Sequence, residues 1–234
     1  LYPQVALSVA RVLRHYGCQV DIPRLQTCCG QPAFNSGYPA EARRVARTLI
    51  EAFRGADWVV TPSGSCGGMV HHHHTSLFAD DPALRSEAED FAGRVYEFSQ
   101  FMMNVLGVDR VAGAFPHKVT YHPSCHGARL LGVRDEPLEI LRRVPGLELA
   151  PLPKAEDCCG FGGTFAVKLA PISVAMTDEK ISHVVGTGAS FLAGTDMGCL
   201  MNIAGRMQAT GVAVQAIHIA ELVDRCLHPE ARSQ

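Results

Sequence analysis

Cys28-Cys29-Gly30 is a tripeptide that occurs a second time in this chain, as Cys158-Cys159-Gly160. Each copy is followed about forty residues later by one more cysteine in a glycine-rich loop, Cys66 in the first case and Cys199 in the second. The two doublets are 130 residues apart and the two later cysteines are 133 residues apart. A repeat at a nearly fixed offset is typical of an internal duplication. The chain is therefore expected to consist of two related halves.

Hydrophobic patterns predict alternating helices and strands in both halves. In the first half we expect helices at 1–16 and 39–53, strands at 20–22 and 58–61, and one long connecting helix at 81–108. In the second half we expect strands at 119–121, 147–152, 190–194 and 212–217, with helices between them. The sequence thus predicts an α/β fold with two pseudo-symmetric halves, residues 1–108 and 109–234, each a mainly parallel sheet flanked by helices.

The two halves do not begin in the same way. The second half starts with a strand and a loop that carries Cys125, which precedes its doublet by 32 intervening residues. The first half starts directly with a helix, so the cysteine equivalent to Cys125 would lie a few residues before Leu1. We therefore expect the sequence to be truncated at its N-terminus.

The composition indicates a globular protein and argues against several classes of partner. Hydrophobic residues make up 47% of the chain, and the formal net charge of -2 provides no basic field to attract a phosphate backbone. No apolar run reaches the length of a membrane span, and the first residues do not resemble a signal peptide. We therefore expect a cytoplasmic protein that binds no nucleic acid and has no membrane span.

Nine cysteines in a reducing compartment need an explanation other than structural disulfides. Adjacent cysteines also bridge each other poorly, which favours metal ligation. Thiolates gathered from glycine-rich loops suit an iron–sulfur cluster, with zinc as the alternative, although zinc sites usually show close Cys-x2-4-Cys pairs that are lacking here. The candidate ligands are Cys125, Cys158, Cys159 and Cys199 in the second half and Cys28, Cys29 and Cys66 in the first.

The remaining cysteines and the histidines have weaker signals. Cys18 and Cys226 have no counterpart in the other half and are expected to be core residues. His122 and His126 flank Cys125 and are expected either to hydrogen-bond a cluster sulfide, to move a proton, or to have a structural role. The run His71–His74 is expected to be a solvated helix or loop, because successive side chains on a helix point in different directions. A nucleophilic pair at Cys125-His126 is disfavoured because adjacency seldom gives the required geometry.

Four motifs closely resemble the lactate utilization protein A family. They are Thr27-Cys-Cys-Gly-Gln-Pro-Ala-Phe-Asn-Ser-Gly37, His122-Pro-Ser-Cys-His126, Asp157-Cys-Cys-Gly-Phe-Gly-Gly-Thr164 and Gly198-Cys-Leu-Met-Asn202. More distantly, the chain resembles the cysteine-rich CCG domains of heterodisulfide reductase and of the iron–sulfur component of glycolate oxidase. The resemblance implies two facing α/β halves and a cytoplasmic iron–sulfur oxidoreductase component. Such a component acts with companion subunits, one of them a ferredoxin-type iron–sulfur protein, in oxidising L-lactate to pyruvate.

The chain departs from the reductase pattern, which ends each half in Cys-x-x-Cys. Here the first of these positions is Ser63 in one half and Asp196 in the other. We therefore expect an ordinary four-iron cluster held by four cysteines, one or two per chain, in an electron-transfer subunit whose substrate chemistry occurs on a partner. The alternatives are a zinc-binding structural or assembly subunit, or the iron–sulfur subunit of a glycolate or other 2-hydroxy-acid oxidase.

Overall fold

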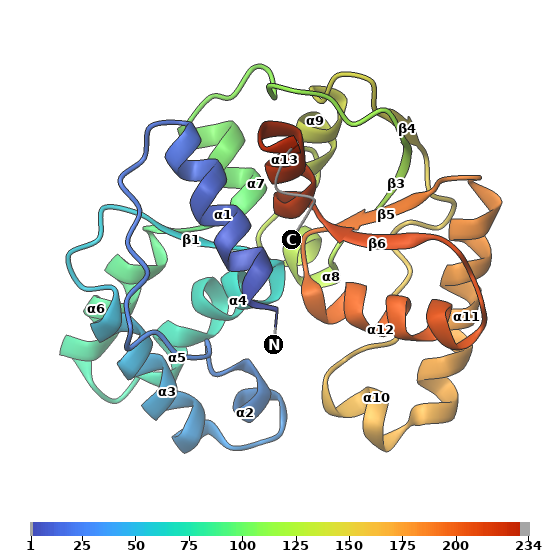
Figure 1. Cartoon of the computed structure of the whole chain (residues 1–234). Coiled ribbons are helices and arrows are strands. Elements are labelled where there is room, and N and C mark those ends of the chain that lie inside the picture. Colours follow the sequence, from blue (N-terminus) through green and yellow to red (C-terminus); the bar gives the residue numbers. More distant parts are fainter. Residues whose placement is uncertain (1, 230–234) are drawn as a thin grey trace.

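The computed structural model describes residues 2–229 and contains two parallel sheets (Figure 1). The first half of the chain lies on the left of Figure 1 and the second half on the right. One sheet has two strands in the order β1-β2, and the other has four in the order β4-β3-β5-β6. All of the strand pairs within the two sheets are parallel, and helices flank both sheets. The predicted α/β class with two halves is confirmed, whereas the boundary at residue 108 stays a prediction.

The first half is mostly helical. Its elements are α1 (Pro3–His15), α2 (Gln31–Asn35), α3 (Pro39–Ala52), β1 (Val59–Thr61), α4 (Gly64–Met69), the π-helical turn η1 (Val70–His74), α5 (Thr75–Leu77), α6 (Pro82–Ala92), β2 (Val95–Glu97), α7 (Phe98–Gln100) and the π-helical turn η2 (Phe101–Val105).

Two predictions for the first half are wrong. Residues 20–22 form no strand, because the chain there runs over the surface, with Ile22 41% exposed, and pairs with no strand. The expected long helix at 81–108 is interrupted by β2, which pairs with β1 and places Val95 opposite Val59. The apolar residues whose spacing predicted one helix are divided between the buried strand β2 and the helical turns that follow it.

The second half follows the predicted order. Its elements are β3 (Lys118–His122), α8 (Cys125–Arg129), α9 (Glu136–Arg142), β4 (Glu148–Ala150), α10 (Thr164–Lys168), α11 (Ala170–Gly186), β5 (Phe191–Gly194), α12 (Met197–Ala209), β6 (Gln215–His218) and α13 (Ile219–Leu227). Every residue of β5 is buried, as expected for an inner strand of a parallel sheet covered on both faces. No helix within residues 2–229 has both the length and the apolar character needed to cross a bilayer.

The halves meet where the loops after β1 and β5 lie against each other. Ser63 and Asp196, which are 133 residues apart like Cys66 and Cys199, form an isolated antiparallel bridge. The Asp196 Oδ2 atom accepts hydrogen bonds from the Ser63 hydroxyl at 3.1 Å and from the Ser65 N–H at 3.0 Å. Its Oδ1 atom accepts the Gly198 N–H at 3.0 Å. One carboxylate therefore joins the first turns of α4 and α12.

A second contact between the halves joins the first and last helices of the chain, α1 and α13 (Figure 1). Asp224 on α13 accepts hydrogen bonds from the Ser8 hydroxyl at 2.9 Å and from the Arg11 guanidinium. Burial raises the pKa of Asp224, but the hydrogen bonds from Arg11 and Ser8 lower it by more, so that the carboxyl stays ionised.

We predict that Gly113→Ala strongly destabilises the fold. Gly113 lies in the connection between the halves with φ at +81°, and a Cβ there would lie 1.9 Å from the Cys226 carbonyl oxygen on α13. Because the backbone must move, we expect a loss of at least about 3 kcal/mol in the free energy of unfolding. Gly107→Ala is the matched control, since Gly107 also has a positive φ of +61° but faces open space. That change should cost about 1 kcal/mol. Equal costs in urea titrations would contradict the prediction.

Glu97 gives a pH-dependent prediction. The side chain is fully buried, its Oε2 atom caps α7 through the Ser99 and Gln100 N–H groups, and burial raises its pKa from 4.5 to about 7. Between these values the unfolded chain releases a proton that the folded chain keeps, so stability falls as pH rises from 4.5 to 7. Glu97→Gln should remove about 3 kcal/mol of this loss. Urea titrations of the unsubstituted protein and of Glu97→Gln at pH 5 and pH 8 measure this loss. If the free energy of unfolding falls by the same amount from pH 5 to pH 8 in both proteins, the prediction is contradicted.

Candidate metal centre

Cysteines of the second half gather at the carboxyl ends of strands. Cys158 and Cys159 lie in the loop after β4, and Cys199 lies in the first turn of α12, directly after β5. The Cys159 thiol hydrogen-bonds with both Cys158 and Cys199. Cys125 begins α8 and interacts electrostatically with Cys158. The structure therefore brings together three of the four predicted ligands in direct contact, with the fourth beside them.

The protonation of these thiols follows from their contacts. The pKa of Cys158 is raised, first by its hydrogen bond with Cys159 and then by burial. The pKa of Cys159 is lowered by Cys158 but raised more strongly by Cys199 and by burial, to about 12. Burial also raises the pKa of Cys125. Because a thiol must lose its proton to bind a metal, binding at these residues would release protons.

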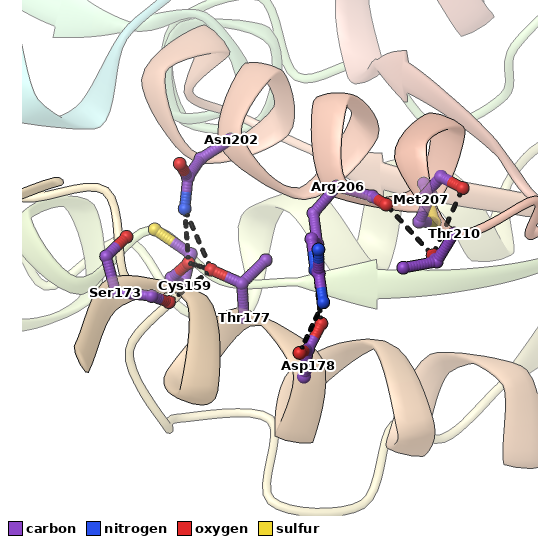
Figure 2. A network of polar contacts seen from close by, with 8 residues as sticks. All are labelled: Cys159, Ser173, Thr177, Asp178, Asn202, Arg206, Met207 and Thr210. Carbon is purple, nitrogen blue, oxygen red and sulfur yellow. Dashed lines mark hydrogen bonds and ion pairs between the residues drawn. The ribbon is translucent and has the colours of Figure 1, made fainter. Parts of the chain in front are cut away.

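Side chains of two helices, α11 and α12, hydrogen-bond to the backbone of the doublet loop, as Figure 2 shows for Cys159. The Cys159 carbonyl accepts hydrogen bonds from the Thr177 hydroxyl of α11 at 3.0 Å and from the Asn202 amide of α12 at 2.9 Å. The Ser173 hydroxyl donates to the Gly160 carbonyl at 2.8 Å. A Cβ at Gly160, where φ is +81°, would lie 2.7 Å from Thr177 Oγ1. Only glycine therefore fits after the doublet.

Sequence reasoning missed this support. Ser173 and Thr177 are polar residues four positions apart on the buried side of α11, which is a signal that the loop they face needs hydrogen-bond donors. Beside them, Arg206 and Asp178 form a bidentate ion pair at 2.6 and 2.8 Å that ties α12 to α11 (Figure 2).

His122 is the last residue of β3 and is 2% exposed. One of its ring nitrogens and the sulfur atoms of Cys159 and Cys199 all lie within 4.8 Å of one another. Neither ring nitrogen has a hydrogen-bond partner in the described part of the chain. Burial, assisted by the charge of Lys180, lowers the pKa of His122 to about 3, so the ring is neutral. An unpaired buried polar group costs about 1–3 kcal/mol, which indicates that this ring has a partner when the site is filled.

Positive charges lie close to the doublet. The Lys180 ammonium is buried and donates to the carbonyls of Lys154 at 2.7 Å and Ala155 at 3.0 Å. It lies within electrostatic range of Cys158 and Cys159. Beside them opens a cavity of about 300 Å³ lined by Arg129, Glu156, Asp157, Cys158, Met176, Glu179 and Lys180. The lining thus holds two cationic and three acidic side chains, and of the cations Lys180 and Arg129 act electrostatically on the thiols of the doublet.

The first half brings its own three predicted ligands together. The Cys29 thiol hydrogen-bonds with both Cys28 and Cys66. Its hydrogen bond lowers the pKa of Cys28 to about 6 and also lowers the pKa of Cys66, while Cys29 keeps its proton. The Cys29 carbonyl contacts His74 Nε2 at 2.8 Å. The pKa of two thiols is thus lowered in the first-half group, whereas the pKa of Cys125, Cys158 and Cys159 is raised in the second-half group.

The remaining histidines have separate contacts. His126 Nδ1 contacts the Gln31 amide at 3.1 Å and so lies toward the first half. His71 and His72 contact the carbonyls of Val95 and Leu130 at 2.9 and 2.6 Å, and His74 is fully buried. The run His71–His74 is therefore a π-helical turn in which His71 and His72 are exposed, as expected for a solvated segment, whereas that expectation is wrong for the buried His74.

Comparison with known proteins supports the sequence motifs. A family profile described as the CCG cysteine-rich domain matches residues 1–71 and 119–204, two stretches that contain all seven candidate ligands. Lactate utilization protein A 2 of Bacillus cereus (strain 03BB102) is 46% identical over 227 residues, which are 97% of this chain and 94% of the relative. Lactate utilization protein A of Geobacillus thermodenitrificans is 48% identical over 223 residues, 95% of this chain and 93% of the relative. With two matched CCG stretches and this identity along nearly its whole length, the chain belongs to the lactate utilization protein A family of CCG cysteine-rich domain proteins.

Proposed function

We propose that this protein is the iron–sulfur electron-transfer component of a cytoplasmic complex that oxidises L-lactate to pyruvate. The observation that carries the proposal is the convergence of Cys125, Cys158, Cys159 and Cys199 at one edge of the second sheet. The reaction is taken from the names of the relatives, which are lactate utilization proteins. The seven cysteines support a metal or cluster, and the choice of iron–sulfur is part of the proposal.

The residues at the second-half site fit such a cluster. Four soft sulfur donors suit iron and sulfide, and Lys180 and Arg129 offset the negative charge that deprotonated thiols and sulfides bring. Thr177 and Asn202 fix the backbone of the doublet through the Cys159 carbonyl (Figure 2). When bound, the cluster would supply one-electron transfer. Cys28, Cys29 and Cys66 would contribute to a second centre in the first half.

Lactate oxidation itself is assigned to a companion subunit. Removing two electrons and two protons from a 2-hydroxy acid requires a proton acceptor and an electron acceptor at the substrate. In the proposed cluster the thiolates of the second half are bound to iron, so they provide no free base for the substrate. The companions we propose are other lactate-utilization subunits, one of them a ferredoxin-type protein that exchanges electrons with this chain.

A zinc-binding structural or assembly role is the second candidate. The set of His122, Cys159 and Cys199 within 4.8 Å has the composition of a three-ligand zinc site. Metal analysis separates the two candidates, because zinc binds without acid-labile sulfide.

We predict that anaerobic reconstitution yields about four irons per occupied site with matching acid-labile sulfide. Cys158→Ser and Cys199→Ser should each lose the iron of the second-half site, since each removes a thiolate from the contacting group. Cys18→Ser is the control, because Cys18 packs against the core and not at either cysteine group. Iron, sulfide and EPR of the dithionite-reduced protein are the measurements. Stoichiometric zinc without sulfide would favour the second candidate instead.

We also predict that this chain restores growth on L-lactate to a bacterium that lacks its own lactate utilization protein A. Cys158→Ser and Cys199→Ser should abolish the restored growth, and Cys18→Ser should preserve it, with protein levels checked by immunoblot. Growth of the matching glycolate-oxidase mutant on glycolate tests the alternative substrate. Restoration on glycolate and not on lactate would show that the assigned substrate is wrong.

A further inference from the structure

Three buried histidines lie near the two cysteine groups, and they differ in what their rings contact. His218 Nδ1 accepts the Ala220 N–H at 3.1 Å and its Nε2 contacts the Pro62 carbonyl at 3.1 Å. His74 Nε2 contacts the Cys29 carbonyl at 2.8 Å. Neither nitrogen of His122 has any such partner within residues 2–229. Both nitrogens of His218 and one nitrogen of His74 therefore have partners in the fold, and His74 Nδ1 has none, whereas the ring of His122 lacks a partner at both nitrogens within the described residues.

The place of His122 in the sheet directs it to the sulfur atoms. It ends β3 in register with Gly194 of β5. Five residues after Gly194 comes Cys199, and the Cys159 thiol contacts Cys199. A nitrogen of the buried ring and the sulfur atoms of Cys159 and Cys199 all lie within 4.8 Å of one another.

The chemistry of the ring narrows its role. A neutral imidazole has one N–H and one nitrogen lone pair, and both are buried here. Once the thiols are deprotonated by metal binding, a hydrogen bond to a sulfur atom would satisfy only the N–H. The lone pair then needs a donor or a metal, and the nearby Asp196 carboxylate oxygens act as acceptors, from Ser63, Ser65 and Gly198, and offer no proton to it. Iron bound by the neighbouring thiolates is the electrophile that the lone pair would meet.

We propose that His122 binds the metal centre of the second half through a ring nitrogen, next to Cys159 and Cys199. The ligation is then mixed nitrogen and sulfur, with His122 in the place of one of the four thiolates, because a four-iron cluster takes one protein ligand at each iron. This inference rests on the proposed function, because it needs an iron–sulfur centre at these residues. Replacing thiolate by imidazole raises the reduction potential of a cluster, so the inference also makes this centre the better electron acceptor of the two.

The decisive experiment is pulsed EPR on the reduced protein, prepared once with natural histidine and once with 15N-histidine. We expect a strong nitrogen hyperfine coupling whose pattern changes from 14N to 15N with the label, as direct ligation requires. The unsubstituted protein gives this result without any variant, so the test does not depend on how a substitution folds. Iron and sulfide present, with histidine coupling no stronger than that of backbone amides, would overturn the inference and leave the proposed function standing.

Two variants assign the coupling to one residue. His122→Cys should keep iron and sulfide, lose the strong coupling, and have a lower reduction potential than the unsubstituted protein. His117→Asn is the matched control, because His117 is exposed just before the amino end of the same strand. It should change neither the coupling nor the potential. A strong coupling that persists in His122→Cys would overturn the assignment, and an unsubstituted protein without iron and sulfide would overturn the proposed function as well.

Discussion

The structure depends on one constraint, which is that the thiols of Cys158, Cys159 and Cys199 come from two distant loops and meet at one edge of the second sheet. Thiols offer weak hydrogen bonds, so they cannot hold these loops themselves. The backbone does it instead, because the Cys159 carbonyl is fixed by Thr177 and Asn202 from two different helices. The parallel sheet supplies the rest, since the loops after its strands open at the same edge. Packing of α11 against α12 is therefore part of the metal centre and not only of the core.

The two cysteine groups have the same arrangement, a doublet and a later cysteine, but the pKa values of most of their thiols are shifted in opposite directions. In the first half, Cys29 donates to its neighbours and the pKa of Cys28 is lowered to about 6. In the second half, the pKa of both Cys158 and Cys159 is raised, and buried Lys180 lies close by. A duplicated sequence has thus produced two cysteine groups with different electrostatic surroundings.

The sequence predicted the cysteine groups because a duplicated spacing carries long-range information that local patterns lack. It predicted most strands as well, since buried parallel strands are continuous apolar runs. The sequence-based prediction failed at β2, because the spacing of Val95 and Phe98 suits a helix. Residues Val95–Glu97 form a strand only because the backbone of β1 pairs with them. The prediction also could not rank His122 above His126. Their roles depend on where β3 ends and on the direction of α8, and both are tertiary facts.

The contact between α4 and α8 connects the two sites physically. Cys66 lies on α4, and Cys125 begins α8. These helices pack against each other, and His126, the residue after Cys125, contacts Gln31, two residues after Cys29. Asp196 bridges the same region by joining the first turns of α4 and α12, which carry Cys66 and Cys199. The helices α4 and α8, one from each half, thus each carry a candidate ligand and also pack at the interface between the halves. Any shift of the halves relative to each other would therefore change both sites at once. The Asp196 carboxylate opposes such a shift, because it accepts two hydrogen bonds from the other half while a third, from the Gly198 N–H, holds it on α12.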